Sequence, residues 1–135
     1  MFTADNVLGL GTAVFNDLTA YLNSLERMKA ANPGRLYCGH GNIIENGKET
    51  LGQYIKHRMI RVEQCSALLK TGGADKQWTS EEITRAIYID TPEHLIRPAM
   101  GNTILVLKKL ASDGLIELQG ADALSGAWHL VGGKL

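Results

Sequence analysis

Tyr37-Cys38-Gly39-His40-Gly41 is the stretch that decides the fold of the first part of this sequence. Arg35 to Cys38 has the pattern of a short strand, and the glycines on both sides of His40 permit a sharp turn where a β-carbon would clash. We therefore expect His40 at the end of a strand. A rigid sheet can aim a side chain in that position at a shared point.

A second polar residue, Asp5, follows another strand pattern. Met1 to Ala4 predicts the end of a strand, and Asp5 to Thr12 predicts a loop that contains glycines. A carboxylate and an imidazole at two strand ends suit zinc or a similar first-row metal ion. The alternative is that Asp5 is a turn residue and His40 a surface group, which is the commoner state of single residues of these types. Two ligands also leave a zinc site incomplete, because a catalytic site takes three from the protein.

Two helices are expected around the second strand. Apolar residues at spacings of three and four predict an amphipathic helix that ends at Asn32-Pro33-Gly34, and a longer, less regular pattern predicts a helix from Lys48 to Lys70. The breaker-rich segment Thr71 to Asp75 is the expected link to the next part. The predicted buried positions are Val14, Leu18, Tyr21, Leu22, Leu25 and Met28 in the first helix, and Leu51, Ile55, Met59 or Ile60, Val62 and Leu69 in the second.

The last part of the chain has a different pattern. Thr79 and Glu82 have the spacing of a capping box at the start of a short helix. A second helix is expected from Thr91-Pro92-Glu93 and a third over Asn102 to Ser112. Two strands, 115–118 and 127–131, follow around a turn at 120–126. Three helices and a hairpin, in this order, predict a winged helix-turn-helix.

Composition limits the classes of protein that this chain can be. Apolar residues make up 44% of its 135 residues, which supports a folded core. With 14 basic and 14 acidic residues, the overall charge gives no reason to expect nucleic acid or an anionic membrane as the partner. Cys38 and Cys65 are too few for a disulfide framework and favour a reducing compartment. We therefore expect an intracellular protein, cytoplasmic or mitochondrial.

The charges are distributed unevenly. Residues 48–72 carry five basic and two acidic residues, whereas residues 73–135 carry six basic and eight acidic residues. A winged helix that binds duplex DNA normally presents a basic face, and the predicted third helix offers only Lys108 and Lys109. The basic patch lies instead on the connecting helix, with His57 beside Arg58. It is interpreted as a solvated face or a contact with the preceding part, with the binding of an anionic substrate by His57 and Arg58 as the alternative.

Several of these segments together resemble one protein family. Phe2 to Gly9 with Gly11 to Phe15 resembles the fourth metal-binding motif of metallo-β-lactamase-fold hydrolases, and Tyr37 to Gly41 resembles the fifth. Tyr54 to Arg58 with Arg61 is similar to the helix that follows the fold in the branch of β-lactamase-like protein 2 and the fungal polyketide thioesterases. Members of that branch end in a winged helix, which Asn102 to Ile116 with Trp128 resembles.

The resemblance implies an α+β chain in three segments. Residues 1–47 would be the C-terminal portion of a metallo-β-lactamase αββα sandwich, residues 48–72 a connecting helix, and residues 73–135 a winged-helix domain. In the full-length family two zinc ions are bound, with Asp5 in the place of the bridging carboxylate and His40 in the place of a ligand of the second ion. The H-x-H-x-D-H motif and the third-motif histidine of the family have no counterpart in this chain, so we expect an incomplete site that is inactive alone.

The implied function is that of a zinc-dependent hydrolase represented by its last part. Because Phe2 to Gly9 is more similar to the fungal thioesterases, the implied substrate is a thioester, small or on an acyl carrier protein, such as a polyketide. Cleavage of RNA by an endoribonuclease of the same fold is the alternative within this class. A non-enzymatic winged-helix module that binds a protein or nucleic acid, or that self-associates through an exposed apolar face, is the alternative outside it. No membrane partner is expected.

Overall fold

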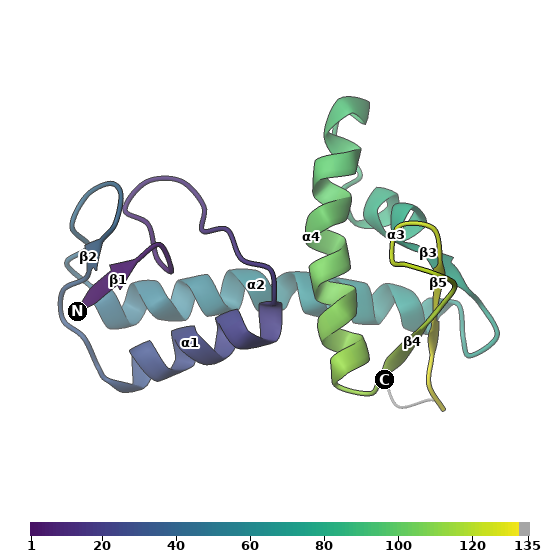
Figure 1. Ribbon diagram of the computed structural model, residues 1–135, viewed down its shortest axis with the longest axis horizontal. Helices are drawn as coiled ribbons and strands as arrows, with labels where there is room; N and C mark the ends of the chain where they lie inside the picture. The colour runs from purple at the N-terminus through teal and green to yellow at the C-terminus, as the bar shows by residue number, and fades with distance from the viewer. Residues whose placement is uncertain (133–135) are drawn as a thin grey trace. The chain divides into compact units, whose positions relative to one another are not determined.

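The computed structural model describes residues 1–132 of the chain, which forms two compact units, Met1–Met59 and Ile60–Leu135. Both units contain part of one long helix, α2 (Gly47–Thr71), which is drawn in Figure 1. The boundary between the units therefore lies within α2. The division into segments 1–47, 48–72 and 73–135 stays a prediction. It was drawn from the family resemblance, whereas the two units are defined by their compactness.

The first unit contains a small parallel sheet and a helix. Strands β1 (Phe2–Ala4) and β2 (Tyr37–Cys38) pair in parallel, with Phe2 opposite Tyr37 and Ala4 opposite Cys38. Helix α1 (Leu18–Ala30) lies between them in the sequence. The strand predictions are thus confirmed in place, although β2 is shorter than predicted. The core of this unit is formed by the fully buried side chains Val7, Leu25, Leu36 and Leu51.

Helix α1 begins later than its apolar pattern predicts. Asp17 is its N-cap and accepts a 2.9 Å hydrogen bond from the backbone N–H of Ala20. Val14 precedes the cap and is 92% exposed, so the prediction that Val14 belongs to the buried face was wrong. An aspartate that satisfies a free helical N–H group fixes the start of a helix more strongly than one further apolar residue does. Leu18, Tyr21, Leu22 and Leu25 are buried as predicted.

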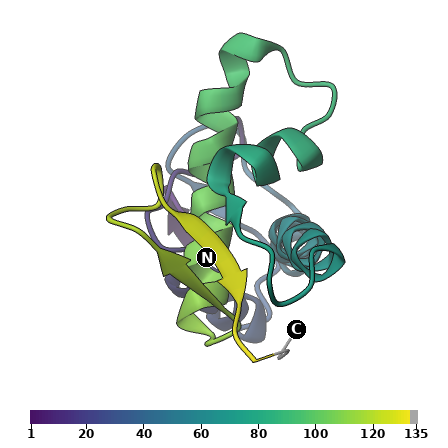
Figure 2. The ribbon, with the colours of Figure 1, turned by 90° about the vertical axis from the view of Figure 1, so that its right-hand side faces the viewer.

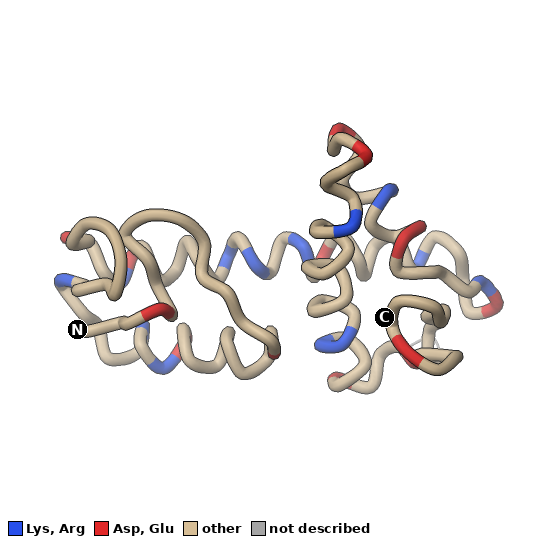
Figure 3. The backbone as a smooth tube through the Cα atoms, turned by 45° about the horizontal axis from the view of Figure 1, so that its top comes forward, with Lys and Arg blue, Asp and Glu red and all other residues tan. Residues whose placement is uncertain are grey.

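Helix α2 was predicted over 48–70 and is found over Gly47–Thr71. Leu51, Val62 and Leu69 are buried as predicted, whereas Ile60 is 43% exposed. Cys65 is also buried, a position that the pattern did not mark. The basic residues occur at intervals along this helix, as the blue positions in Figure 3 show.

The second unit contains the helices and sheet of the tail. Helix α3 (Ser80–Ile87) packs on α4 (Glu93–Ser112), and a three-stranded antiparallel sheet has the order β3-β5-β4. The strands are β3 (Trp78–Thr79), β4 (Ile116–Gln119) and β5 (Ala127–Leu130). Figure 2 shows the hairpin of β4 and β5 beside α4. The core is formed by Ile83, Val106, Leu107, Leu110, Ile116 and Trp128.

Two details of this unit differ from the sequence-based expectation. The segments predicted as a second and a third helix are one continuous helix, α4, which contains both Pro98 and Gly101. A proline removes one helical hydrogen bond and a glycine costs about 1 kcal/mol, and packing of Ala99, Thr103 and Ile104 in the buried interior offsets such losses. Strand β3 was not predicted, because two residues are too few to show an alternating pattern.

The capping box at the start of α3 is confirmed. The side chain of Thr79 accepts from the backbone N–H of Glu82 at 3.1 Å, and the carboxylate of Glu82 accepts from the backbone N–H of Thr79 at 2.8 Å. These two bonds satisfy two backbone donors that the start of a helix otherwise leaves free.

Among the described helices, none is both long and apolar enough to cross a bilayer.

Candidate functional site

Asp5 and His40 follow the two strands of the parallel sheet. Because β1 and β2 run in the same direction, their carboxyl ends lie at the same edge, and the residues that follow them are brought together. The imidazole Nε2 of His40 lies 3.6 Å from Oδ1 of Asp5. Both side chains are largely exposed, by 76% for His40 and 79% for Asp5. The structure therefore joins the two predicted site residues on an open surface.

The backbone around Asp5 is shaped for this approach. Gly39 donates a 2.9 Å hydrogen bond from its N–H to the carbonyl of Ala4, and a β-carbon at Gly39 would lie 2.7 Å from Oδ1 of Asp5. Ala4 has a φ of 47°, in the left-handed region that residues other than glycine rarely adopt. Such a conformation persists only where its surroundings enforce it. It turns the chain directly before Asp5.

The loop after Asp5 is fixed to the turn that contains His40. The N–H of Gly9 donates to the carbonyl of His40 at 2.8 Å, and Gly9 forms a parallel bridge with Gly41. The buried hydroxyl of Thr3 donates to the carbonyl of Val7 at 2.9 Å and holds the start of the same loop. Two loops that are more than thirty residues apart in the sequence are thus one small structural element, with Asp5 and His40 on it.

The pair has the spacing that ligands of one metal ion have. Two donors bound at about 2.1 Å to a tetrahedral zinc ion stand roughly 3.4 Å apart, close to the 3.6 Å between Oδ1 of Asp5 and Nε2 of His40. A carboxylate oxygen and an imidazole nitrogen are also ordinary zinc donors. Within residues 1–132, however, no group of three or more His, Cys, Asp and Glu side chains could hold a metal ion. The residues present fit one edge of a metal centre, and their role as ligands stays a prediction.

His57 and Arg58 lie on α2, and neither belongs to the Asp5–His40 pair. Together with Gln53 and Tyr54 they form one side of a hollow of about 200 Å³, and Gly11 and Thr12 form the other. The guanidinium carbon of Arg58 is 4.9 Å from the centre of the Phe15 ring. Residues 53, 54, 57 and 58 share a helix face, so helical spacing could have marked the lining on α2, but the loop residues Gly11 and Thr12 carried no such signal.

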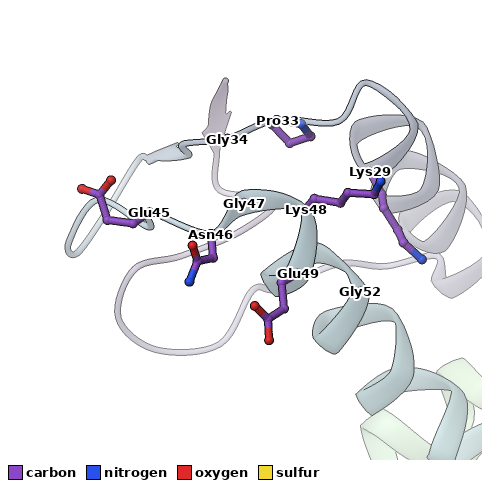
Figure 4. A pocket seen from close by; sticks show the side chains of 9 residues that line it. All are labelled: Lys29, Pro33, Gly34, Glu45, Asn46, Gly47, Lys48, Glu49 and Gly52. Atoms are coloured by element: carbon purple, nitrogen blue, oxygen red, sulfur yellow. The ribbon is translucent and has the colours of Figure 1, made fainter.

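A larger hollow of about 540 Å³ lies at the start of α2 (Figure 4). Its charged lining is balanced, with Lys29 and Lys48 against Glu45 and Glu49. Figure 4 shows these side chains spread around the first turn of the helix without a common point to which they turn. We assign no function to this hollow, because balanced and dispersed charges select no ligand.

The two cysteines and His129 were also considered as site residues. Cys38 is half-buried in β2, and burial of the Cys65 thiol raises its pKa to about 12, which keeps that thiol protonated. In the second unit, His129 lies 3.8 Å from Glu117 across the hairpin. We assign no metal-binding role to His129 or to the two cysteines.

Comparison with known proteins shows which proteins this chain is similar to. Residues 79–128 match the family model of the β-lactamase associated winged helix domain. The chain is 40% identical over 117 residues to a β-lactamase-like protein 2 homolog of Caenorhabditis elegans, covering 87% of this chain and 39% of that protein. It is 36% identical over 133 residues to the lactamase-like protein vrtG of Penicillium aethiopicum, covering 95% of this chain and 43% of that protein. These matches cover most of this chain and correspond to the C-terminal part of metallo-β-lactamase-fold proteins.

Solved structures support the same fold. A metallo-β-lactamase family protein from Thermus thermophilus has a TM-score of 0.65 at 20% identity, over 95% of this chain and 40% of that one. A β-lactamase domain protein from Burkholderia ambifaria has a TM-score of 0.74 at 18% identity, over 96% of this chain and 41% of that one. The α+β class and the winged helix are thus confirmed. This metallo-β-lactamase-fold chain spans about two fifths of the length of the relatives that it matches.

Proposed function

We propose that this chain is the last part of a zinc-dependent hydrolase and that Asp5 and His40 supply two ligands of its metal centre. The observation that carries the proposal is the 3.6 Å separation of Oδ1 of Asp5 and Nε2 of His40 at one edge of a parallel sheet. The separation corresponds to the span between two ligands of one ion. The resemblance of Phe2 to Gly9 and Tyr37 to Gly41 to two metal-binding motifs supports the same assignment.

In this proposal Asp5 and His40 supply two ligands of the metal centre, and its remaining ligand positions are open in this chain. The carboxylate of Asp5 would add negative charge to the centre, and Nε2 of His40 would supply a nitrogen ligand. Zinc bound there would supply Lewis-acid polarisation of a carbonyl oxygen and would make water more acidic. Gly39 permits the close approach of Asp5, and the pairing of Gly9 with Gly41 holds the turn of His40 in place. The further ligands of the centre are expected from the H-x-H-x-D-H and third-motif segments that this family resemblance implies.

We propose a thioester as the substrate, either small or carried by an acyl carrier protein. The resemblance of Phe2 to Gly9 to the corresponding segment of the fungal thioesterases supports this choice. The charges of the second unit weigh against cleavage of RNA. Arg85 pairs with Glu81 and Glu93, and Lys109 pairs with Asp113. Carboxylates beside these cations weaken their attraction for the phosphates of RNA.

Binding of zinc by the chain is testable without an activity assay. We expect titration with Zn²⁺ to shift the ring signals of His40, observed by ¹H–¹³C NMR, before those of His57, His94 and His129. Asp5→Asn removes the charged ligand and should weaken the binding at least about tenfold, since a ligand of the metal is lost. His57→Gln is the matched control and should leave the affinity unchanged. Equal shifts of all four histidines, or unchanged affinity in Asp5→Asn, would reject the assignment.

The sequence encoded before Met1 gives a second test. An in-frame segment with H-x-H-x-D-H would support the proposed hydrolase, and a stop codon or an unrelated segment would count against it. The chain alone, with two ligands, is expected to bind zinc below one equivalent and to hydrolyse neither model thioesters nor RNA at a measurable rate.

A further inference from the structure

The hollow between the Gly11–Thr12 loop and α2 has the composition of an anion site. Its lining consists of Gly11, Thr12, Gln53, Tyr54, His57 and Arg58, and it contains no carboxylate. The volume of about 200 Å³ is below the range of about 300–1,000 Å³ that holds a whole drug-sized ligand. The hollow therefore has room for one polar group of a larger molecule.

Arg58 is the centre of this site because its side chain is held in place. Its guanidinium carbon lies 4.9 Å from the centre of the Phe15 ring and 5.9 Å from that of Tyr21. These two rings stack on each other with centres 4.3 Å apart and planes inclined by 5°. Arg58 also forms a side-chain hydrogen bond with Tyr21. Because a guanidinium carries five N–H donors, others remain for a ligand.

Arg58 also lacks a charge partner within residues 1–132, where no carboxylate approaches it within 4 Å. Arg35, by contrast, is paired with Glu45 at 2.9 Å. A half-buried guanidinium without a carboxylate partner favours an oxyanion that can accept hydrogen bonds from its remaining N–H groups. The neighbouring His57 ring, the Thr12 hydroxyl and the Gln53 amide add further donors.

The hollow is close to the proposed metal edge along a fixed loop. The N–H of Gly9 is 2.8 Å from the carbonyl oxygen of His40, and two extended residues span at most roughly 7 Å, so Gly11 lies within about 10 Å of that oxygen. The hydroxyl of Tyr54 donates to the carbonyl of Leu8 at 3.0 Å and ties this loop to α2. One small molecule can therefore reach both places.

We infer that the hollow around Arg58 binds a carboxylate of the acyl group of the substrate while the group to be hydrolysed lies at the Asp5–His40 edge. The binding of a carboxylate rests on the geometry around Arg58. The position of the hydrolysed group at the Asp5–His40 edge rests on the proposed function. A carboxylate can accept two hydrogen bonds from a guanidinium. Because the hollow is close to the Asp5–His40 edge, we place this carboxylate on the acyl group of the substrate. The substrate class is thus an acyl thioester with a second, anionic terminus.

The experiment uses the 135-residue chain, with glutarate and inorganic phosphate as separate probes. We expect glutarate to produce saturable NMR shifts of the backbone amides of Gly11 and Thr12 and of the Nε–H of Arg58. Arg58→Gln should weaken glutarate binding at least about tenfold, and Arg58→Lys should weaken it several-fold, because a lysine keeps the charge but loses the fork. Lys56→Gln removes the same charge from a neighbouring position of α2 outside the lining of the hollow and should have no effect.

Thr12→Ala and His57→Gln are additional variants, because Arg58 also packs on Phe15 and its replacement can disturb folding. Each should reduce the affinity for glutarate while the amide spectrum outside the hollow stays unchanged. Absence of saturable shifts, an unchanged affinity in these variants, or tighter binding of phosphate than of glutarate would overturn the carboxylate site. The last result would favour a phosphate-containing substrate such as RNA.

Failure of this inference is distinguishable from failure of the proposed function. Asp5→Asn should leave the affinity for glutarate unchanged, since Asp5 is outside the lining of the hollow. If zinc binds His40 but glutarate does not bind, the carboxylate site is rejected and the metal assignment stands. If glutarate binds and zinc does not, the anion site stands and the proposed hydrolase centre is rejected.

Discussion

The indole Nε1 of Trp128 donates a 2.9 Å hydrogen bond to Oγ of Ser80, and both residues are buried. The hydroxyl of Ser80 donates in turn to the carbonyl of Ala123 at 2.7 Å. One side chain thus joins β5, the first turn of α3 and the loop between β4 and β5. Buried polar groups of this kind are costly to leave without a partner.

We predict that Ser80→Ala destabilises the second unit by about 1–3 kcal/mol, because the buried indole N–H and the Ala123 carbonyl both lose their partner. Chemical denaturation followed by the fluorescence of Trp78 and Trp128 measures the change. Ser112→Ala, at the exposed end of α4, is the matched control and should change the stability by less than about 0.5 kcal/mol. Equal effects of the two substitutions would show that the buried bond adds no stability.

The glycines of the Asp5–His40 edge give a second prediction. A β-carbon at Gly9 would overlap the backbone of Asn42, whereas one at Gly34 would meet nothing within 4 Å. Gly9→Ala should therefore separate the two loops and destabilise the first unit by about 1–3 kcal/mol, and Gly34→Ala should be close to neutral. Amide hydrogen exchange of Gly9, whose N–H is bonded to His40, reports the separation directly. Retained protection of that amide in Gly9→Ala would contradict it.

The sequence predicted the elements whose signals are local. The capping box of Thr79 and Glu82, the glycines on both sides of His40 and the turn between β4 and β5 each depend on neighbouring residues, and each was found. The start of α1 was misplaced because the cap of Asp17 outweighed the apolar Val14. The single helix α4 was divided because Pro98 and Gly101 are local breaking signals that packing overrides.

The candidate site was predictable only in part. Asp5 and His40 could be placed at strand ends from the sequence, but their 3.6 Å separation depends on a parallel pairing across more than thirty residues. The hollow around Arg58 could not be predicted, because Phe15, Tyr21 and Thr12 approach it only through tertiary contacts. Periodicity shows which residues share a helix face and gives no information on the loop that faces it.

The two cysteines should differ in reactivity. Burial raises the pKa of the Cys65 thiol to about 12, and only 1% of that residue is exposed, whereas Cys38 is half-buried. Because the thiolate is the reactive form, iodoacetamide at a pH of about 8 should label Cys38 in the folded chain and leave Cys65 unmodified. Peptide mass spectrometry measures both sites, and labelling in denaturant, where both cysteines should react, is the control. Equal labelling under native conditions would contradict the burial of Cys65.

The capping box predicts a dependence of stability on pH. The backbone and side-chain hydrogen bonds from Thr79 lower the pKa of Glu82. A carboxylate with a lowered pKa in the folded state stabilises that state above its unfolded pKa of about 4.3, and the contribution is lost as the pH falls through the lower folded value.

Glu82→Gln keeps an acceptor for the Thr79 N–H but loses the charge at the helix N-terminus, so we expect a loss of about 0.3–1 kcal/mol near neutral pH. The difference from the unsubstituted chain should shrink steadily below a pH of about 4. Thr79→Ala removes the N-cap acceptor itself and should cost about 1 kcal/mol at either pH. Urea denaturation of the three chains at a pH of about 7 and of about 3 separates the two effects. A Glu82→Gln difference of equal size at both values would mean that the charge of Glu82 does not stabilise α3.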